Sequence, residues 1–171
     1  WGLRFLQPAS DAMVLDCGCG GGANIKTLLK LCPKGKVQGI DYSAVSVEKA
    51  RKVNARAIAA GRCTVQQASV AELPFEAEQF EVVTAFETVY FWPELAQNFR
   101  EVYRVLKPGG IFFICNEANG ETAKDDKWTQ IINGMTIYTD TALKAYLEQA
   151  GFCKIQSHKN KKGWLCVTAR K

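Results

Sequence analysis

Four glycines fall within five positions, from Gly18 to Gly22, between an apolar run and an amphipathic segment. The stretch reads VLDCGCGGGANIKTLL over residues 14–29. Because glycine has no Cβ, such a run lets the chain turn sharply and brings bare backbone N–H groups close to a ligand at the start of a helix. The stretch therefore predicts a strand, a glycine turn and a helix that hold a ligand against the backbone.

Short β-rich runs alternate with helical runs in the rest of the first two thirds of the chain. We expect strands over residues 13–17, 36–41, 63–68, 80–86 and 111–116, and helices over about 23–31, 44–60 and 93–106. Ser43 is a good N-cap for the second helix, and Gly61 ends it. Continuous apolar strands separated by helices are typical of a parallel sheet that is covered on both faces.

The last third of the chain has a different pattern. Residues 118–136 are polar and irregular, so we expect a loop with one short helix there. A helix follows in DTALKAYLEQAG, with Asp140 or Thr141 as its cap and Gly151 as its stop. The runs FCKIQSHK and GWLCVTAR are joined by a short polar turn, which makes them antiparallel strands.

Together these elements predict an α/β fold of one domain over residues 1–171. We expect a doubly wound, Rossmann-like and mostly parallel seven-stranded sheet with a C-terminal antiparallel strand and helices on both faces. A hydrophobic fraction of 47% with 23% charged residues fits one domain with a substantial core.

The composition and the first residues of the chain also indicate where the protein is located and whether it binds a metal ion. No apolar run approaches the roughly 20 residues of a membrane span. The opening WGLRFLQPAS lacks the regions of a signal peptide, so we expect a cytoplasmic protein whose N-terminal region has been trimmed. Seven cysteines without a CxxC pair, beside one histidine, indicate reduced thiols and no metal site.

The formal net charge is +5, and the excess gathers near the C-terminus around HKNKKG. A nucleic-acid patch would have this composition. A solvated turn between two strands would have it too, and we favour that interpretation.

An acid at the end of the second strand completes the nucleotide-binding pattern. Asp41 would lie at the carboxyl edge of the sheet, where its carboxylate can accept hydrogen bonds from both ribose hydroxyls. The letters GCGGGA formally fit the NAD fingerprint, so an NAD-binding oxidoreductase remains an alternative. However, Asp16 lies two residues before the first glycine, where a negative charge suits an ammonium group better than a pyrophosphate. The pattern therefore favours a ligand with a cationic end.

Five motifs in register carry a resemblance to a known family. LDCGCGGG, GIDYS, ASVAELPF, FEVVTAFETVYFWP and RVLKPGG follow one another between Met13 and Gly110. The chain resembles class I S-adenosylmethionine-dependent methyltransferases, most of all the small-molecule group of methyltransferase type 11 and the ubiquinone/menaquinone enzymes. The resemblance implies methyl transfer from S-adenosylmethionine to a small-molecule acceptor, with S-adenosylhomocysteine as product.

The resemblance also implies roles for residues of the glycine loop and the second strand. Asp16 and the backbone of Gly18, Cys19 and Gly20 would hold the methionine end of the cofactor. Asp41 would bind the ribose hydroxyls.

Four further residues would surround the adenine. Tyr42 would cover one face, Ser69 and Val70 would meet the edge, and the carbonyl of Phe86 would accept from the amino group. Ser69 departs from the aspartate that the family often has, and serine accepts this hydrogen bond more weakly.

Methyl transfer from a sulfonium is an in-line displacement with an activated leaving group, so the enzyme mainly aligns the reactants and excludes water. We expect Glu87 and Tyr90, after the fourth strand, to contact the acceptor or remove its proton. Five other residues are candidates at the same edge: Trp92, Asn116, Glu117, Trp128 and Tyr138.

The sequence also contains weaker signals of other functions. Tyr103 and Lys107 have the YxxxK spacing of short-chain dehydrogenases, but Pro108 follows the lysine directly and an ordinary amphipathic helix explains the spacing. The segment after the fourth strand lacks the Pro-Pro-aromatic motif of base-amino methyltransferases, which disfavours nucleic acid. An RNA or protein methyltransferase and a non-catalytic cofactor-binding module remain alternatives.

Overall fold

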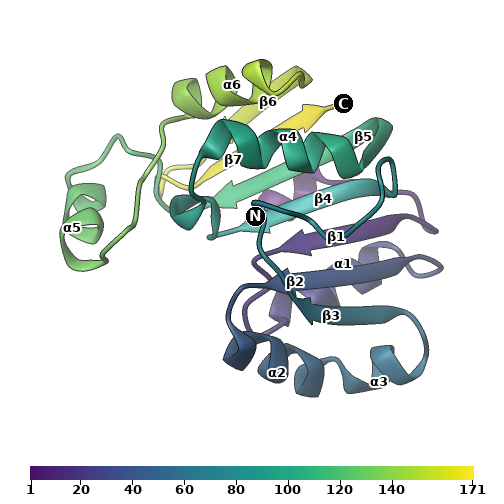
Figure 1. Ribbon diagram of the computed structural model, residues 1–171. Helices are drawn as coiled ribbons and strands as arrows, with labels where there is room; N and C mark the ends of the chain where they lie inside the picture. The colour runs from purple at the N-terminus through teal and green to yellow at the C-terminus, as the bar shows by residue number, and fades with distance from the viewer.

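A computed structural model describes residues 1–171, apart from the side chains of Ala123, Lys124 and Asp126. One sheet runs through the molecule in the strand order β3-β2-β1-β4-β5-β7-β6 (Figure 1). Its strands are β1 (Met13–Cys17), β2 (Lys36–Asp41), β3 (Cys63–Gln67), β4 (Phe80–Phe86), β5 (Leu106–Asn116), β6 (Cys153–Lys159) and β7 (Leu165–Arg170). The helices are α1 (Ala23–Leu31), α2 (Ala44–Val53), α3 (Ala55–Ala59), α4 (Leu95–Val105), α5 (Ala123–Ile131) and α6 (Asp140–Gln149), with 3-10 turns η1 (Gly2–Phe5) and η2 (Val89–Phe91).

The pairing confirms the predicted doubly wound sheet. Strands β1 to β5 pair in parallel, whereas β7 is antiparallel to both β5 and β6. The chain moves outward from β1 to β3 and then crosses back to β4 on the other side of β1. The carboxyl ends of β1 and β4 thus lie side by side at the point where the strand order reverses, which is where doubly wound sheets bind ligands.

Buried side chains form one core on each face of the sheet. On one face, Leu15 and Phe112 pack with Phe99 of α4 and Leu143 of α6. On the other face, the alternate strand residues pack with α1, α2 and η1; they include Val14, Val82 and Phe113. This two-sided burial explains why the inner strands have no polar face in the sequence.

The predicted helix over residues 44–60 is broken in two. Asn54 is buried between α2 and α3, and its Nδ2 donates to the carbonyls of Gly22, at 3.0 Å, and Ala50, at 2.9 Å. The amide thus ends α2 and ties it to the glycine loop, at the cost of helix continuity.

Two other predicted boundaries are wrong. Thr139, rather than Asp140 or Thr141, caps α6, because its Oγ1 accepts from the N–H of Ala142 at 3.2 Å. The Asp140 carboxylate is drawn away to β6, where Ser157 Oγ donates to it at 3.1 Å. In addition, α4 ends at Val105 and β5 includes the KPGG turn, with a register shift opposite Phe80.

The polar turn predicted near the C-terminus joins β6 to β7, as the solvated-turn interpretation requires. Within the described residues all seven cysteines are free thiols, and five of them are buried. Among those residues there is also no group of His, Cys, Asp and Glu that could hold a metal ion. None of the helices described is long and apolar enough to cross a membrane.

Candidate active site

The glycine loop after β1 is folded tightly against the end of β2. The N–H groups of Gly18 and Cys19 both donate to the carbonyl of Ile40, at 2.8 and 2.9 Å. Gly18 has a φ of +72°, and a Cβ on it would lie 2.1 Å from Thr88 Oγ1. Only glycine fits there, so the loop can pass close to the residue that follows β4.

Asp41 ties the glycine loop to the start of α2. One carboxylate oxygen, Oδ2, accepts from the N–H of Gly20, and the other, Oδ1, accepts from the N–H of Ser43, both at 2.9 Å. A carboxylate has about four acceptor positions. Asp41 is nearly buried and still lines a cavity, so it has acceptor capacity left for a ligand.

Asp16 is a buried carboxylate at the end of β1, with 1% of its surface exposed. Thr84 Oγ1 of β4 donates to its Oδ1 at 2.7 Å, but Oδ2 has no partner among the described residues. Burial raises the pKa of Asp16 to about 7, and the charge of Asp41 adds to this, although the Thr84 hydroxyl lowers it. A cationic ligand group would supply the missing partner and hold Asp16 in its charged form.

A first cavity of about 440 Å³ opens beside the glycine loop. It is lined by Gly18, Asp41, Tyr42, Ala68, Ser69, Val70, Thr88, Phe91, Trp92, Pro93, Asn133 and Gly134. Five of the residues predicted to bind the cofactor thus share one cavity, although their segments are separated in the sequence. Tyr42 is 79% exposed at its rim.

The other predicted cofactor residues lie outside this lining. Gly20 is tied to the lining because its N–H donates to Asp41. Asp16 is buried at the end of β1, and Cys19 is buried in the core under α1. The side chain of Phe86 points to the other core, where its ring lies 5.4 Å from that of Phe113. The role that the sequence suggested for Phe86 uses its backbone carbonyl, so this orientation of the side chain does not contradict it.

A second cavity of about 360 Å³ lies between the ends of β4 and β5, helix α5 and the β6–β7 turn. Its lining consists of Glu87, Tyr90, Glu117, Ala118, Thr122, Asp125, Trp128, Met135, Lys162, Gly163 and Trp164. It brings together four of the predicted acceptor residues. Of the other candidates, Trp92 lines the first cavity, and Asn116 and Tyr138 line neither.

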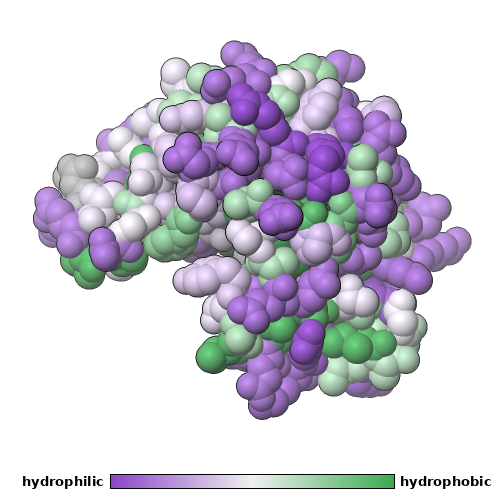
Figure 2. All heavy atoms as spheres, in the orientation of Figure 1, coloured by the Kyte–Doolittle hydropathy of each residue, from purple (hydrophilic) through white to green (hydrophobic). Residues whose placement is uncertain are grey.

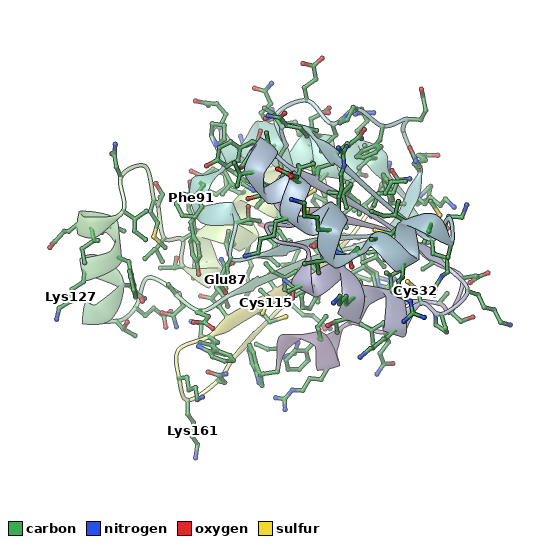
Figure 3. The ribbon with its side chains drawn as sticks, turned by 90° about the horizontal axis from the view of Figure 1, so that it is seen from below. Cys32, Glu87, Phe91, Cys115, Lys127 and Lys161 are labelled. Carbon is green, nitrogen blue, oxygen red and sulfur yellow. The ribbon has the colours of Figure 1, made fainter. Side chains whose placement is uncertain are left out.

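The two cavities share a wall. Along the connection after β4, Glu87 and Tyr90 face the second cavity, whereas Thr88 and Phe91 face the first. Figure 3 shows Glu87 and Phe91 on the side of the sheet that faces α5, which carries Lys127. The segment after α5 divides the cavities in the same way, with Gly134 on one side and Met135 on the other. The same two short stretches of chain therefore line both cavities.

Glu87 and Tyr90 form a hydrogen-bonded pair in this wall. Tyr90 Oη accepts from the N–H of Ala118 at 2.9 Å and lies 3.2 Å from Glu87 Oε2, to which it donates. Partial burial and the charge of Glu117 raise the pKa of Glu87 to about 7, although the Tyr90 hydroxyl and the Glu117 backbone lower it. Burial and the charge of Glu87 raise the pKa of Tyr90. Near neutral pH, Glu87 can thus accept a proton and Tyr90 remains a neutral donor.

The YxxxK spacing has a structural explanation. Tyr103 packs against Phe152, with ring centroids 5.2 Å apart. Lys107 lies in β5 and pairs with Glu81 at the edge of the sheet opposite to the cavities. The spacing therefore forms no dyad at the site.

Sequence reasoning missed several residues of the site. Thr84 holds Asp16, Thr88 faces the glycine loop, and Asn133 with Gly134 closes the first cavity from the far end of α5. A polar residue within the apolar run FEVVTAF was a usable signal for Thr84. Asn133 and Gly134 had no local signal, because they reach the cavity through the path of the chain.

Comparison with known proteins agrees with this geometry. Residues 15–114 match the profile of the family described as "Methyltransferase domain". A demethylmenaquinone methyltransferase of Lactiplantibacillus plantarum is 37% identical over 118 residues, which cover 68% of this chain and 49% of that protein. The 24-methylenesterol C-methyltransferase 2 of Arabidopsis thaliana is 29% identical over 135 residues, covering 78% of this chain and 37% of the relative.

Solved structures share the fold. A SAM-dependent methyltransferase from Aquifex aeolicus superposes with a TM-score of 0.81 at 22% identity, covering 98% of this chain and 85% of that one. The chain spans about half or less of the length of the two curated relatives. The family profile covers more than half of the chain and includes the glycine loop, Asp41 and the β4–β5 region. The chain therefore belongs to the methyltransferase domain family of class I S-adenosylmethionine-dependent enzymes.

Proposed function

We propose that this chain transfers a methyl group from S-adenosylmethionine in the first cavity to a small-molecule acceptor in the second. The observation that carries this proposal is that consecutive residues line the two cavities, with Glu87 in the second and Thr88 in the first, so that the methyl group and the acceptor would meet beside this segment. The relatives support a small acceptor, since one is named for demethylmenaquinone and another for a sterol. A single domain over residues 1–171 and a cytoplasmic location are part of the same proposal.

The residues present fit the cofactor. Asp16 would bind its ammonium group, because Asp16 Oδ2 is buried without a partner. The turn at Gly18, Cys19 and Gly20 would receive its methionine end, and Asp41 would accept from the ribose hydroxyls.

The adenine would lie toward the β3 side of the first cavity. Tyr42 would stack on one face, and Ser69 with Val70 would meet its edge. The backbone carbonyl of Phe86 stays a candidate acceptor for the amino group. S-adenosylmethionine supplies an electrophilic methyl group when bound, and the chain aligns the acceptor with it.

Ser69→Asp should tighten binding of S-adenosylhomocysteine about three- to tenfold. Ser69 Oγ already accepts from the N–H of Ala71 at 3.1 Å, so a second bond from an amino group competes for it. An aspartate keeps this turn and offers a charged second oxygen, which is worth roughly 1 kcal/mol more. Calorimetric titration measures the change, with Ser69→Ala as the control. Unchanged or weaker binding in Ser69→Asp would remove Ser69 from the adenine edge.

In the transfer itself, Glu87 would accept the proton that the acceptor loses. Tyr90 would act as a positioning residue: its hydroxyl, fixed by the Ala118 N–H, holds the Glu87 carboxylate at the wall. The apolar side chains of Phe91 and Trp92 would keep water from the reacting atoms.

The position of the transferred methyl group tests the proposal. S-adenosylmethionine labelled with ¹³C in the methyl group should give nuclear Overhauser contacts to Thr88 and Tyr90, and none to Val70. Contacts to Val70 alone would place the reacting end away from the second cavity and refute the arrangement. NAD should fail to displace the labelled cofactor. Displacement by NAD would support the oxidoreductase alternative.

A further inference from the structure

The lining of the second cavity carries more acidic than basic side chains. Its lining holds three carboxyl groups, Glu87, Glu117 and Asp125, and one ammonium group, Lys162. Asp125 Oδ2 accepts from the N–H groups of Asn119 and Gly120, so it holds the loop before α5. Among the described residues, Glu87 and Glu117 form no ion pair.

Aromatic rings make up much of the remaining wall. Tyr90, Trp128 and Trp164 all line the cavity, and Trp128 is half exposed. The ammonium of Lys162 lies over the Trp164 ring, 5.1 Å from its centroid. The wall therefore already holds one cation on an aromatic face, independently of the carboxylates.

We propose that the acceptor of the second cavity is a small amine, held as its ammonium between Glu87, Glu117 and the ring of Trp128. This inference rests on the proposed function, of which it names the substrate class. A neutral acceptor would leave the Glu87 and Glu117 carboxylates repelling each other, and the one ammonium group of the lining, that of Lys162, lies over the Trp164 ring. An ammonium group relieves that repulsion and gains the aromatic faces.

The groups that face Glu87 come from several elements. Glu117 and Cys115 approach from the end of β5, Tyr90 from η2, and Lys162 enters the cavity from the β6–β7 turn. Glu117 and Lys162 have opposite effects on a bound cation. Because Lys162 lies over Trp164, Trp128 is the ring left for the ligand.

The step balances with the groups present. The bound ammonium gives one proton to the Glu87 carboxylate and becomes a neutral amine. Its lone pair forms the new N–C bond while the C–S bond breaks, and that electron pair stays on sulfur as a thioether. The product is an N-methylammonium ion, and Glu87 returns its proton to water.

Two probes of the same shape and different charge test the proposal. Choline is a cation that cannot be methylated at nitrogen, and 3,3-dimethylbutan-1-ol is its neutral counterpart. The indole N–H signals of Trp128 and Trp164 report binding by NMR, with and without S-adenosylhomocysteine. We expect choline to bind at least tenfold more tightly than the alcohol. Equal affinity of the two probes or tighter binding of the alcohol would overturn the proposal. So would a failure of both probes to bind at about 50 mM, which corresponds to a binding free energy weaker than about −2 kcal/mol.

Variants locate the cation. Glu87→Gln, Glu117→Gln and Trp128→Leu should each weaken choline about three- to tenfold and leave the alcohol unchanged. Glu48→Gln, on the exposed face of α2, is the matched control and should change neither. If choline is unaffected by all three variants, it binds elsewhere and the proposal fails.

The outcome is separable from that of the proposed function. Binding of S-adenosylhomocysteine is measured in the same samples from the indole N–H signal of Trp92, which lines the first cavity. If that ligand does not bind but choline does, the methyltransferase assignment fails and the cation site remains. If it binds and choline does not, the proposed function remains and the amine acceptor is rejected.

Discussion

Asp41→Ala should raise the dissociation constant of S-adenosylhomocysteine at least about 100-fold, which corresponds to roughly 3 kcal/mol. Two effects add. The variant removes a charged acceptor of ribose hydroxyls, and such bonds are worth about 1.5–3 kcal/mol each. It also removes the acceptor of the Gly20 and Ser43 N–H groups, so the glycine loop loses its attachment to α2. Calorimetric titration measures the affinity.

The same variant should remain folded. Two N–H groups lose their partner, at a cost of about 1–3 kcal/mol in the free energy of unfolding, whereas the sheet and both cores are untouched. Circular dichroism checks the fold, and Asp11→Ala, at an exposed position before β1, is the control. Asp41→Ala with wild-type affinity would exclude Asp41 from the site.

Asp16→Asn should weaken S-adenosylhomocysteine binding about 30-fold or more and at the same time stabilise the ligand-free protein at pH 8. The buried carboxylate of Asp16 has one oxygen without a partner and a pKa raised to about 7 by its burial. Asparagine keeps the acceptor for the Thr84 hydroxyl and removes the charge. The ammonium group of the ligand then loses its counter-ion, while the empty site loses an unfavourable buried charge.

The contribution of Asp16 to the free energy of unfolding should depend on pH. Between the ordinary aspartate pKa of 3.8 and about 7, folded Asp16 binds a proton that the unfolded chain has released. The contribution of Asp16 to stability therefore falls as pH rises through this window, by about 4 kcal/mol in total, and is level above it. Urea unfolding at pH 5 and pH 8 covers the upper part of this window and should show a loss of about 2–3 kcal/mol in the wild type and a smaller one in Asp16→Asn.

Ligand binding should have the opposite trend. Because the ammonium group needs the charged form of Asp16, affinity should rise with pH up to about 7, by at most about tenfold per unit. Asp16→Asn should bind with little dependence on pH. Identical pH profiles for the variant and the wild type would show that Asp16 is not the counter-ion.

The elements that the sequence predicted correctly depend on local signals. Strand β1 and helix α1 begin and end as expected, because an apolar run and a glycine turn define them without help from the rest of the chain. The break at Asn54 was not predictable in this way, since it depends on a hydrogen bond to Gly22, 32 residues away in the sequence. The cap at Thr139 was missed because Asp140 is drawn to β6.

The residues of the site show the same difference between local signals and contacts distant in the sequence. Asp16 and Asp41 follow directly from their places at strand ends, where parallel strands bring side chains together. The two cavities were not predictable, because α5 stands away from the sheet (Figure 1) and the segment after it supplies Gly134 and Met135 to different cavities. In Figure 2, polar and apolar side chains are intermixed over the face in view.

Thermal unfolding with S-adenosylhomocysteine, with NAD and without ligand tests the central claim most directly. A ligand at about 100 times its dissociation constant adds roughly 2.7 kcal/mol, which for a domain of this size raises the midpoint by about 5–10 °C. We predict this rise with S-adenosylhomocysteine and no change with NAD. A rise with NAD alone would contradict the account, because it would place a pyrophosphate where Asp16 requires a cation.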